Sequence, residues 1–328
     1  MSTKTQILAL LESNRGQSIS GEYIAERLNI SRSAVWKSIK ELEKAGYKIK
    51  AVTNKGYCLS EDNDIISIQG ILPYLSNEDF SEKIFVYDSL ESTNKTAKEM
   101  AISGAKHGSV IIADNQTAGR GRYDRKFFSP PGHGVYMSLI IHPSRMWFET
   151  STLLTIFAAV SVCEAIESIT EKKPQVKWVN DIFLERKKIC GILTEAVLDL
   201  ESGNIQWIVI GIGINFSTPS IDFPEDLQNI AGSIFYDGNP TATRNQLIAE
   251  IANRMVLPEI HCSEKQIVEK YRQRLMMIGK RVTVSGFGEP YEAIALDIDD
   301  LGGLVVKKDT GEITTLSAGE ISVRENPR

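Results

Sequence analysis

The sequence has few of the residues that cross-link a chain or bind metal. Its 328 residues include only four cysteines and four histidines. The histidines are dispersed, and the cysteines form no C-x-x-C pair. A structural zinc site or a disulfide framework needs such residues at close, regular spacing. We therefore expect neither kind of site. The cysteines are Cys58, Cys163, Cys190 and Cys262.

Long hydrophobic runs are also missing. The longest unbroken apolar stretch, residues 156–160 with leucines nearby, is far shorter than the ~20 residues that a membrane span needs. The first residues show no basic segment followed by an apolar run and a cleavage site, so no secretory signal is expected. The sequence therefore predicts a cytoplasmic protein without membrane contact. A composition of 42% hydrophobic and 24% charged residues is typical of globular domains.

Charge is distributed unevenly along the chain. Residues 1–60 carry ten Lys and Arg against five Glu, a net charge of +5, whereas the whole chain carries −5. The remaining residues therefore hold a net charge of −10. A basic head on an acidic body is typical of a nucleic-acid-binding module attached to another domain. Charge alone is equally compatible with a solvated basic face.

The hydrophobic spacing of the basic head predicts three helices. Apolar residues recur at helical spacing around Ile7, and two further helices can begin at the N-cap residues Ser20 and Ser31. The second helix ends at Asn29 and the third stops at Gly46, so about three residues separate them. Two helices joined so tightly are typical of a helix-turn-helix whose second helix enters the major groove of DNA.

A predicted hairpin follows the third helix. Residues 47–52 and 57–59 alternate as strands around a turn at 53–56, which makes a winged helix-turn-helix. The alternative is a three-helix packing domain without DNA, which would not need a basic face and a wing. The candidate DNA-binding residues are Ser31, Arg32, Ser33, Trp36, Lys37, Lys40 and Lys55.

Beyond residue 62 the pattern predicts a mixed sheet covered by helices, and then a small β-barrel. Short turns between neighbouring strands favour hairpins over parallel crossovers. We expect an α+β multidomain protein with domains at 1–62, 63–272 and 273–328. The strands expected in the middle domain are 83–87, 109–113, 135–141, 175–178, 188–198 and 206–212, and its helices are 65–75, 93–103, 152–169 and 244–258. Those expected in the last domain are 281–285, 291–298, 303–308, 312–316 and 321–324.

A basic, glycine-rich loop is the most informative segment for chemistry. Residues 120–126 contain three arginines and one lysine, and Gly119 and Gly121 let the backbone approach a ligand. Arginine forks and exposed N–H groups suit a polyphosphate and the charge that builds as pyrophosphate leaves. The Walker spacing is absent. Composition alone would also fit a solvated basic loop.

Five motifs, in order and spacing, resemble those of biotin–protein ligases. They are Glu91-Ser-Thr-Asn94, the loop from Gln116 to Arg122, Lys177-Trp-Val-Asn-Asp181, Lys188-Ile-Cys-Gly-Ile-Leu193 and Gly211-Ile-Gly-Ile-Asn215. With the winged N-terminus, the whole chain resembles the bifunctional bacterial biotin ligases and biotin operon repressors. The match runs from the first helix to Gly319-Glu-Ile-Ser322.

The resemblance implies a two-step reaction. Biotin and ATP, with Mg²⁺, would give biotinyl-5'-adenylate and pyrophosphate, and the biotinyl group would pass to a lysine of a biotin carboxyl carrier protein. It also implies repression at operator DNA of biotin genes by an adenylate-bound homodimer. The C-terminal barrel would be SH3-like.

The resemblance also assigns the site residues. The catalytic residues would be Lys188, Arg122 and Asp181, and Asp181 would also be the Mg²⁺ ligand. The biotin-binding residues would be Ser92, Thr93, Asn94, Gln116, Arg120, Gly121, Arg122 and Lys188. The adenylate-binding residues would be Arg120, Arg122, Arg125, Phe127, Asn180, Lys188 and Asn215. Ser92 and Thr93 could instead cap a helix, and Asn180 and Asp181 could simply stabilise a turn. We expect Gly211 and Gly213 to serve backbone approach and sheet packing.

The chain departs from the family pattern at three places. Val179 replaces the usual proline, Phe127 stands where tryptophan is frequent, and Tyr123-Asp124 replaces basic or small residues. Two other functions remain open. A lipoate ligase would share the catalytic architecture but lacks this form of basic loop and the winged N-terminus. A biotin-sensing transcription factor without ligase activity is disfavoured by the presence of Arg122 and Lys188.

Overall fold

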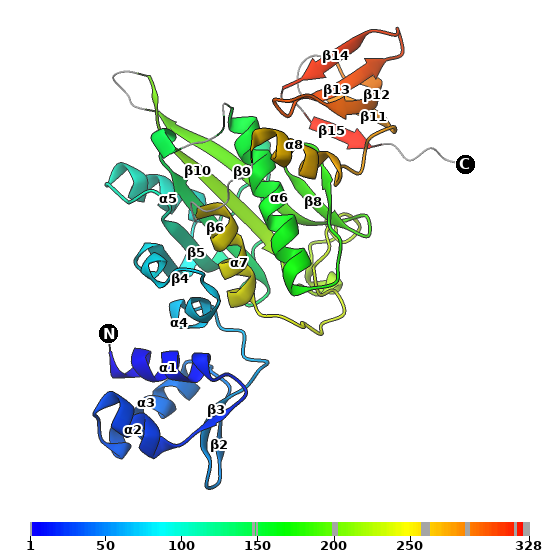
Figure 1. Ribbon diagram of the computed structural model, residues 1–328. Helices are drawn as coiled ribbons and strands as arrows, with labels where there is room; N and C mark the ends of the chain where they lie inside the picture. Colours follow the sequence, from blue (N-terminus) through cyan, green and yellow to red (C-terminus); the bar gives the residue numbers. More distant parts are fainter. Residues whose placement is uncertain are drawn as a thin grey trace.

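The computed structural model describes residues 2–145, 148, 150–198, 203–256, 263–285, 289–317 and 320–323. These residues form three β-sheets that follow one another along the chain, with three, seven and five strands. Figure 1 shows the N-terminal helices below the central sheet and the last strands beyond its other end. The predicted fold class, an α+β chain with a helix-turn-helix head, a mixed central sheet and a β C-terminus, is confirmed.

The N-terminal unit has the predicted helix-turn-helix. The side chains of Ser20 and Ser31 cap the second and third helices, as expected from the sequence, and Asn29 ends the second in the left-handed conformation. Strands β1, β3 and β2 form a small antiparallel sheet beside them. The elements are α1 (Thr3–Ser13), β1 (Ser18–Ile19), α2 (Gly21–Leu28), α3 (Arg32–Lys44), β2 (Ile49–Val52) and β3 (Gly56–Leu59).

The wing between β2 and β3 depends on one glycine. Gly56 has φ of 103°, and a Cβ built there would lie 2.0 Å from the Ile19 carbonyl oxygen. Only glycine combines that backbone angle with such a close approach. The turn therefore fixes the direction in which the wing, with Lys55, leaves the domain.

The central sheet has the order β4-β5-β6-β10-β9-β8-β7. Hairpins join β7 to β8, β8 to β9 and β9 to β10, as predicted. The exception is β4 and β5, which pair in parallel across helix α5, so the expectation of hairpins fails there. The strands are β4 (Ile84–Leu90), β5 (Val110–Gln116), β6 (Gly134–Ile141), β7 (Gln175–Lys177), β8 (Asp181–Leu184), β9 (Lys187–Leu198) and β10 (Ile205–Asn215).

Helices cover both faces of this sheet. Helices α6 and α7 pack on one face in the main core, and α5 packs on the other through Ala97 and Ala101. The helix predicted over 65–75 is only α4 followed by a 3-10 turn, because Pro73 lacks a backbone N–H. The helix α8 was not predicted. The helices are α4 (Ile68–Ile71), α5 (Thr93–Ile102), α6 (Ser151–Ile169), α7 (Arg244–Val256) and α8 (Glu264–Arg272); Pro258, the predicted end of α7, lies outside the described residues.

Among the described residues, one helix is long and apolar enough to cross a membrane. This helix is α6, and 72% of its most apolar window is buried inside the protein. Its apolar surface is therefore covered by the central sheet and by α7 and α8. This burial is typical of a core helix.

The C-terminal strands form an antiparallel sheet of order β14-β13-β12-β11-β15. Its closure into an SH3-like barrel stays a prediction. The indole Nε1 of Trp178 donates to the Gly302 carbonyl at 2.9 Å, so this sheet is attached beside the 177–181 motif. The strands are β11 (Arg281–Ser285), β12 (Tyr291–Ile298), β13 (Leu304–Lys308), β14 (Ile313–Leu316) and β15 (Glu320–Val323); the predicted strand end Arg324 and the motif residue Gly319 lie outside the described residues.

A buried arginine ties the linker after the winged unit to the central sheet. The side chain of Arg244, at the start of α7, is 4% exposed. Its Nε donates to Asp64 Oδ2 at 2.8 Å, and its Nη1 donates to Asp114 Oδ1 at 2.5 Å. Asp114 lies two residues before Gln116 on β5. The linker and the edge of the candidate site therefore share one charged anchor.

Candidate active site

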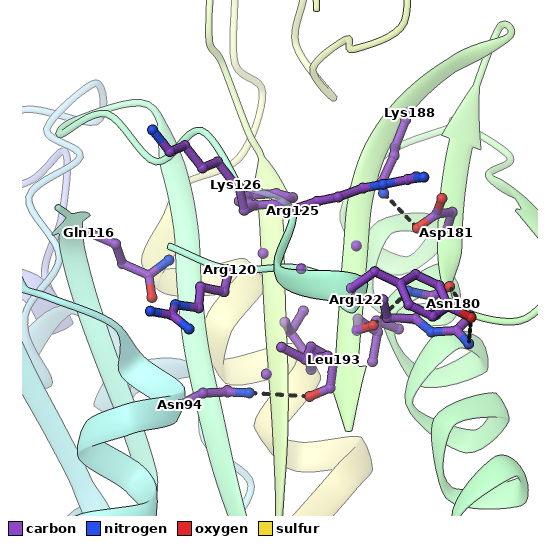
Figure 2. Close-up of a pocket in the computed structure, with 18 of the residues that line it drawn as sticks. Asn94, Gln116, Arg120, Arg122, Arg125, Lys126, Asn180, Asp181, Lys188 and Leu193 are labelled. Atoms are coloured by element: carbon purple, nitrogen blue, oxygen red, sulfur yellow. Dashed lines mark hydrogen bonds and ion pairs between the residues drawn. The ribbon is translucent and has the colours of Figure 1, made fainter. Parts of the chain in front are cut away.

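A pocket of about 320 Å³ lies over the central strands β9 and β10. Five segments line it: the start of α5, the basic loop, the 177–181 motif, the two central strands and the segment around Leu227 and Ile230. In Figure 2, Gln116 and Asn94 stand on one side of the pocket and Arg122, Asn180, Asp181 and Lys188 on the other. The structure therefore brings together most of the residues that the sequence analysis selected.

Glycines form the floor of the pocket. A Cβ at Gly213 would lie 2.6 Å from the ring of Phe127, and one at Gly211 would lie 2.1 Å from Asn94 Oδ1. Any side chain at either position would displace these neighbours. The two glycines thus allow the close approach expected from the sequence, and they also line the pocket.

The uncharged end of the pocket is a hydrogen-bonded group at the start of α5. Gln116 Oε1 accepts from the Thr93 backbone N–H at 2.8 Å and lies 3.1 Å from Thr93 Oγ1. Ser92 is the N-cap residue of α5, but its side chain makes no capping bond. Its hydroxyl is thus not used in the way that the capping alternative required. This end offers oxygen and nitrogen atoms to a small polar ring.

The basic loop is an ordered turn. Gly121 N donates to Arg125 O at 2.7 Å, and Phe127 N donates to Gly119 O at 2.9 Å. Tyr123 and Asp124 both have φ of 55°, a left-handed conformation that is uncommon for residues other than glycine. Asp124 pairs with Arg120 at 3.1 Å, so part of the loop's positive charge is neutralised at the surface.

The charged end of the pocket contains the predicted catalytic group. Lys188 Nζ lies 2.6 Å from Asp181 Oδ1, and Arg122 Nη1 lies 3.5 Å from Asn180 Oδ1. The Arg122 guanidinium also lies over the Tyr123 ring. Two cations thus face one carboxylate, an arrangement that leaves positive charge available for phosphate oxygens.

Buried groups hold this end in place. The Tyr271 hydroxyl donates to Val179 O at 3.0 Å, and burial raises the pKa of Tyr271, so the phenol keeps its proton. Asn180 Nδ2 donates to Ile192 O at 2.8 Å, which fixes the amide at the pocket edge. The Trp178–Val179 peptide, at the position of the replaced proline, is cis.

Asn215 lies apart from the other predicted ligand residues. It is 6% exposed, it is not among the pocket-lining residues, and its Nδ2 donates to Gly232 O at 3.0 Å. Gly232 N in turn donates to Lys188 O. Asn215 therefore anchors the segment that runs beside Lys188, and its contact with adenine stays a prediction.

Some lining residues carry no sequence signal. Leu227 and Ile230 reach the pocket from an irregular segment with neither periodicity nor a motif, so sequence reasoning had nothing to find. Tyr123, Lys177 and Phe183 also line it. The described residues contain no cluster of three or more His, Cys, Asp or Glu side chains placed to hold a metal ion. Asp181 is thus the acidic side chain that the pocket offers to Mg²⁺.

The predicted DNA-binding residues share an exposed surface. All of those on or before α3 are exposed, Trp36 among them at 56%, and so is Lys55 on the wing. Lys40 pairs with Glu43 at 2.6 Å. The opposite side of α3 is buried through Val35, Ile39 and Leu42. The helix therefore turns its basic side away from the protein.

Sequence families match three successive parts of the chain. Residues 3–58 match a helix-turn-helix domain, residues 86–215 match the biotin/lipoate A/B protein ligase family, and residues 277–324 match the biotin protein ligase C-terminal domain. These three matches follow the order of the three sheets.

Relatives and solved structures agree with this. The chain is 34% identical to the bifunctional ligase/repressor BirA of Bacillus subtilis over 319 residues, 94% of this chain and 95% of the relative. It is 30% identical to the protein of the same name from Escherichia coli, over 97% and 96% of the two chains. The biotin protein ligase of Aquifex aeolicus, solved in complex with biotin and ATP, superposes with a TM-score of 0.63 at 27% identity and covers 74% of this chain and 99% of its own.

Proposed function

The chain belongs to the biotin/lipoate A/B protein ligase family, among its bifunctional ligase/repressors, and from this premise we propose how its pocket works. It is a biotin–protein ligase with a repressor role, and biotin and ATP are its substrates. The observation that carries the mechanism is the single pocket, with the hydrogen-bonding group of Thr93 and Gln116 at one end and Arg122, Lys188 and Asp181 at the other.

The uncharged end binds the ureido ring of biotin. Thr93 and Gln116, with Ser92, Asn94 and the backbone at Gly121, supply short polar groups above the glycine floor. A buried polar ring needs a partner for each donor and acceptor, because an unpaired one costs free energy. The biotin chain then extends toward Lys188.

The charged end activates the carboxylate. A carboxylate oxygen of biotin bonds to the α-phosphorus of ATP, and the bond from that phosphorus to the pyrophosphate oxygen breaks. Lys188 reduces repulsion between the carboxylate and the phosphates, and Arg122 neutralises charge on the leaving pyrophosphate. Arg120, Arg125, Asn180 and Phe127 complete the adenylate site. In the second step the lysine amine of a biotin carboxyl carrier protein attacks the acyl carbon, AMP leaves and the amine loses a proton.

Mg²⁺ would enter with ATP. Magnesium is commonly bound by one or two carboxylates together with substrate phosphates, and a single carboxylate, Asp181, lies at the charged end. When bound there, the ion would neutralise phosphate charge. Asp181 would turn from Lys188 to the ion as the substrates arrive, which would release the Lys188 ammonium for the carboxylate.

The repressor role uses the winged unit. Arg32, Ser33, Trp36 and Lys37 on α3, with Ser31, Lys40 and Lys55, would contact operator DNA, and two subunits would pair when the adenylate is bound. We assign the DNA-binding domain to residues 1–62, the catalytic domain to 63–272 and the C-terminal domain to 273–328. We place the protein in the cytoplasm, where carrier protein and operator DNA are found.

One assay tests both half-reactions. The full chain is incubated with biotin, ATP and Mg²⁺, and the products are weighed by mass spectrometry with and without a carrier domain. Biotinyl-adenylate and a singly biotinylated carrier are expected. Acylation by lipoate instead of biotin would indicate lipoate ligation, and biotin binding without adenylate would indicate a sensor; either result would overturn the proposal.

A further inference from the structure

Asn94 at the pocket edge is hydrogen-bonded on both sides by residues outside the pocket lining. Its Nδ2 donates to Glu195 Oε2 at 2.7 Å, and its Oδ1 accepts from Ser138 Oγ at 2.6 Å. Glu195 lies on β9, and Ser138 on β6 is completely buried. Glu195 also pairs with Lys98, one helical turn after Asn94 on α5. Figure 2 shows the amide nitrogen of Asn94 directed across the floor toward β9, where it also lies 3.4 Å from Leu193 O.

The carboxylate of Glu195 fixes the direction of these hydrogen bonds. An ionised carboxylate only accepts, so the Asn94 amide must turn its NH₂ group to Glu195 and its oxygen to Ser138. The single hydroxyl hydrogen of Ser138 is then used by Asn94 Oδ1. Ser138 Oγ also lies 2.8 Å from Thr93 Oγ1, and with its own hydrogen committed it can only accept there. The Thr93 hydroxyl must therefore donate to Ser138.

This direction leaves an acceptor pair facing the pocket. With its hydrogen turned to Ser138, Thr93 Oγ1 offers lone pairs to the cavity, 3.1 Å from Gln116 Oε1. Gln116 is fixed as an acceptor at this point, because its Oε1 takes the Thr93 backbone N–H and its Nε2 donates to Ser129 Oγ at 3.1 Å. Two adjacent oxygens without a hydrogen between them match a donor from a ligand.

We propose that Glu195 is a positioning residue for biotin binding, which acts through Asn94 and Ser138 to make Thr93 Oγ1 an acceptor for a ligand N–H. The proposal rests on the proposed function, because a ureido ring carries N–H donors whereas a dithiolane ring carries none. A site that is built to bond an N–H discriminates strongly against an analogue that lacks one. The carboxylate of Glu195 thereby contributes to the choice between biotin and lipoate without touching either.

The test is a thermodynamic cycle on biotin affinity, measured by calorimetry on the full chain. Glu195→Ala removes the acceptor of Asn94 and should weaken biotin binding about tenfold, the size of one lost hydrogen bond. Thr93→Val removes the hydroxyl and should give a similar loss. The double variant should be within about twofold of Thr93→Val, because the two residues act through one bond. The KM for ATP should not change.

Two further variants separate positioning from general stability. Glu195→Gln still offers an oxygen to Asn94 and should recover most of the affinity. Glu164→Ala is the matched control, because Glu164 is 29% exposed and pairs with a lysine on a neighbouring helix, whereas Glu195 is 30% exposed. Its biotin affinity should equal that of the parent. If Glu195→Ala does not fold, Ser138→Ala tests the same step, since Thr93 then turns its hydrogen to Gln116.

Parental affinity in Glu195→Ala or Ser138→Ala would overturn the proposal, as would losses that multiply in the double variant. Failure of the proposed function looks different, because the parent itself would then bind no biotin or form no adenylate.

Discussion

Lys188 Nζ lies 2.6 Å from Asp181 Oδ1, so the two catalytic candidates with opposite charge neutralise each other before any substrate binds. Both side chains are partly exposed, at 31% and 22%. An ion pair of this kind contributes little to stability. Its value is kinetic, since phosphates and a cation can replace the partners and set the Lys188 ammonium beside the biotin carboxylate.

Replacement of Lys188 by Ala should therefore reduce adenylate synthesis about 100-fold or more while the free energy of unfolding changes by less than about 1 kcal/mol. Pyrophosphate release and urea unfolding measure the two effects. Lys307→Ala, a change at an exposed strand lysine in the C-terminal sheet, is the control and should alter neither. Adenylate formation at the parental rate would remove Lys188 from the mechanism.

The basic loop gives a second prediction. Arg122 reaches Asn180 and covers Tyr123, so it spans the opening between the loop and the 177–181 motif. Arg122→Gly should remove this closure and let the mixed anhydride escape from the site before the carrier arrives. Bystander proteins mixed with the enzyme, biotin and ATP should then become biotinylated on lysines. A variant that labels only its carrier and holds its adenylate as long as the parent would contradict the retention role.

The buried Arg244 should matter for stability rather than chemistry. Its removal leaves the carboxylates of Asp64 and Asp114 close together without their cation. Breaking a buried ion pair from one side typically costs about 3–5 kcal/mol. Arg244→Ala should lower the free energy of unfolding by roughly that amount in urea titration. Arg281→Ala, which breaks an exposed pair with Asp309, should cost less than about 1 kcal/mol. Equal losses in the two variants would refute the anchor.

The difference between these sites shows what could be predicted from sequence. The caps Ser20 and Ser31 act on residues three positions away, so the helices that they begin were predicted. Arg244 bonds to residues 130 and 180 positions earlier, and no local pattern marks such partners. For the same reason the parallel pairing of β4 and β5 was missed, because it depends on a crossover through α5 and not on a turn.

The candidate site follows the same division. Lys188, Arg122 and Gln116 stand in motifs whose order along the chain could be matched to a family, and the structure brings them into one pocket. Glu195 and Ser138 lie under that pocket, and their importance appears only when hydrogen-bond directions are followed across three strands. Leu227 and Ile230 come from irregular backbone, where side-chain spacing carries no information.

Burial should protect two thiols from alkylation. Cys163 and Cys190 are buried, and burial raises the pKa of each thiol, so little thiolate is present at pH 8. Cys58 in the winged unit is only partly buried. Iodoacetamide at pH 8 should label Cys58 well before either buried thiol, as mapped by peptide mass. In urea all three should react. Similar rates in the native protein would show that the core of the central sheet opens readily.

The last prediction concerns the face of α3. Arg32 and Lys37 are exposed on the side of α3 that faces away from the protein, where they can reach a groove and its phosphates. The Arg32→Ala, Lys37→Ala double variant should lose at least tenfold in affinity for a palindromic duplex that the parent selects from a random pool. If the lost contacts are to phosphate, the slope of affinity against salt should fall by about 1 for each.

Ligase activity of that double variant should remain at the parental level, because α3 lies in a separate unit from the pocket (Figure 1). Lys4→Ala removes an equal charge from α1 and is the control for a general loss of basicity. Sedimentation with and without biotin and ATP tests the dimer, since an adenylate that pairs subunits must raise DNA affinity by the same coupling free energy with which DNA favours the pair. DNA affinity that ignores the adenylate, or a double variant that binds the duplex as tightly as the parent, would separate the winged unit from the proposed regulation.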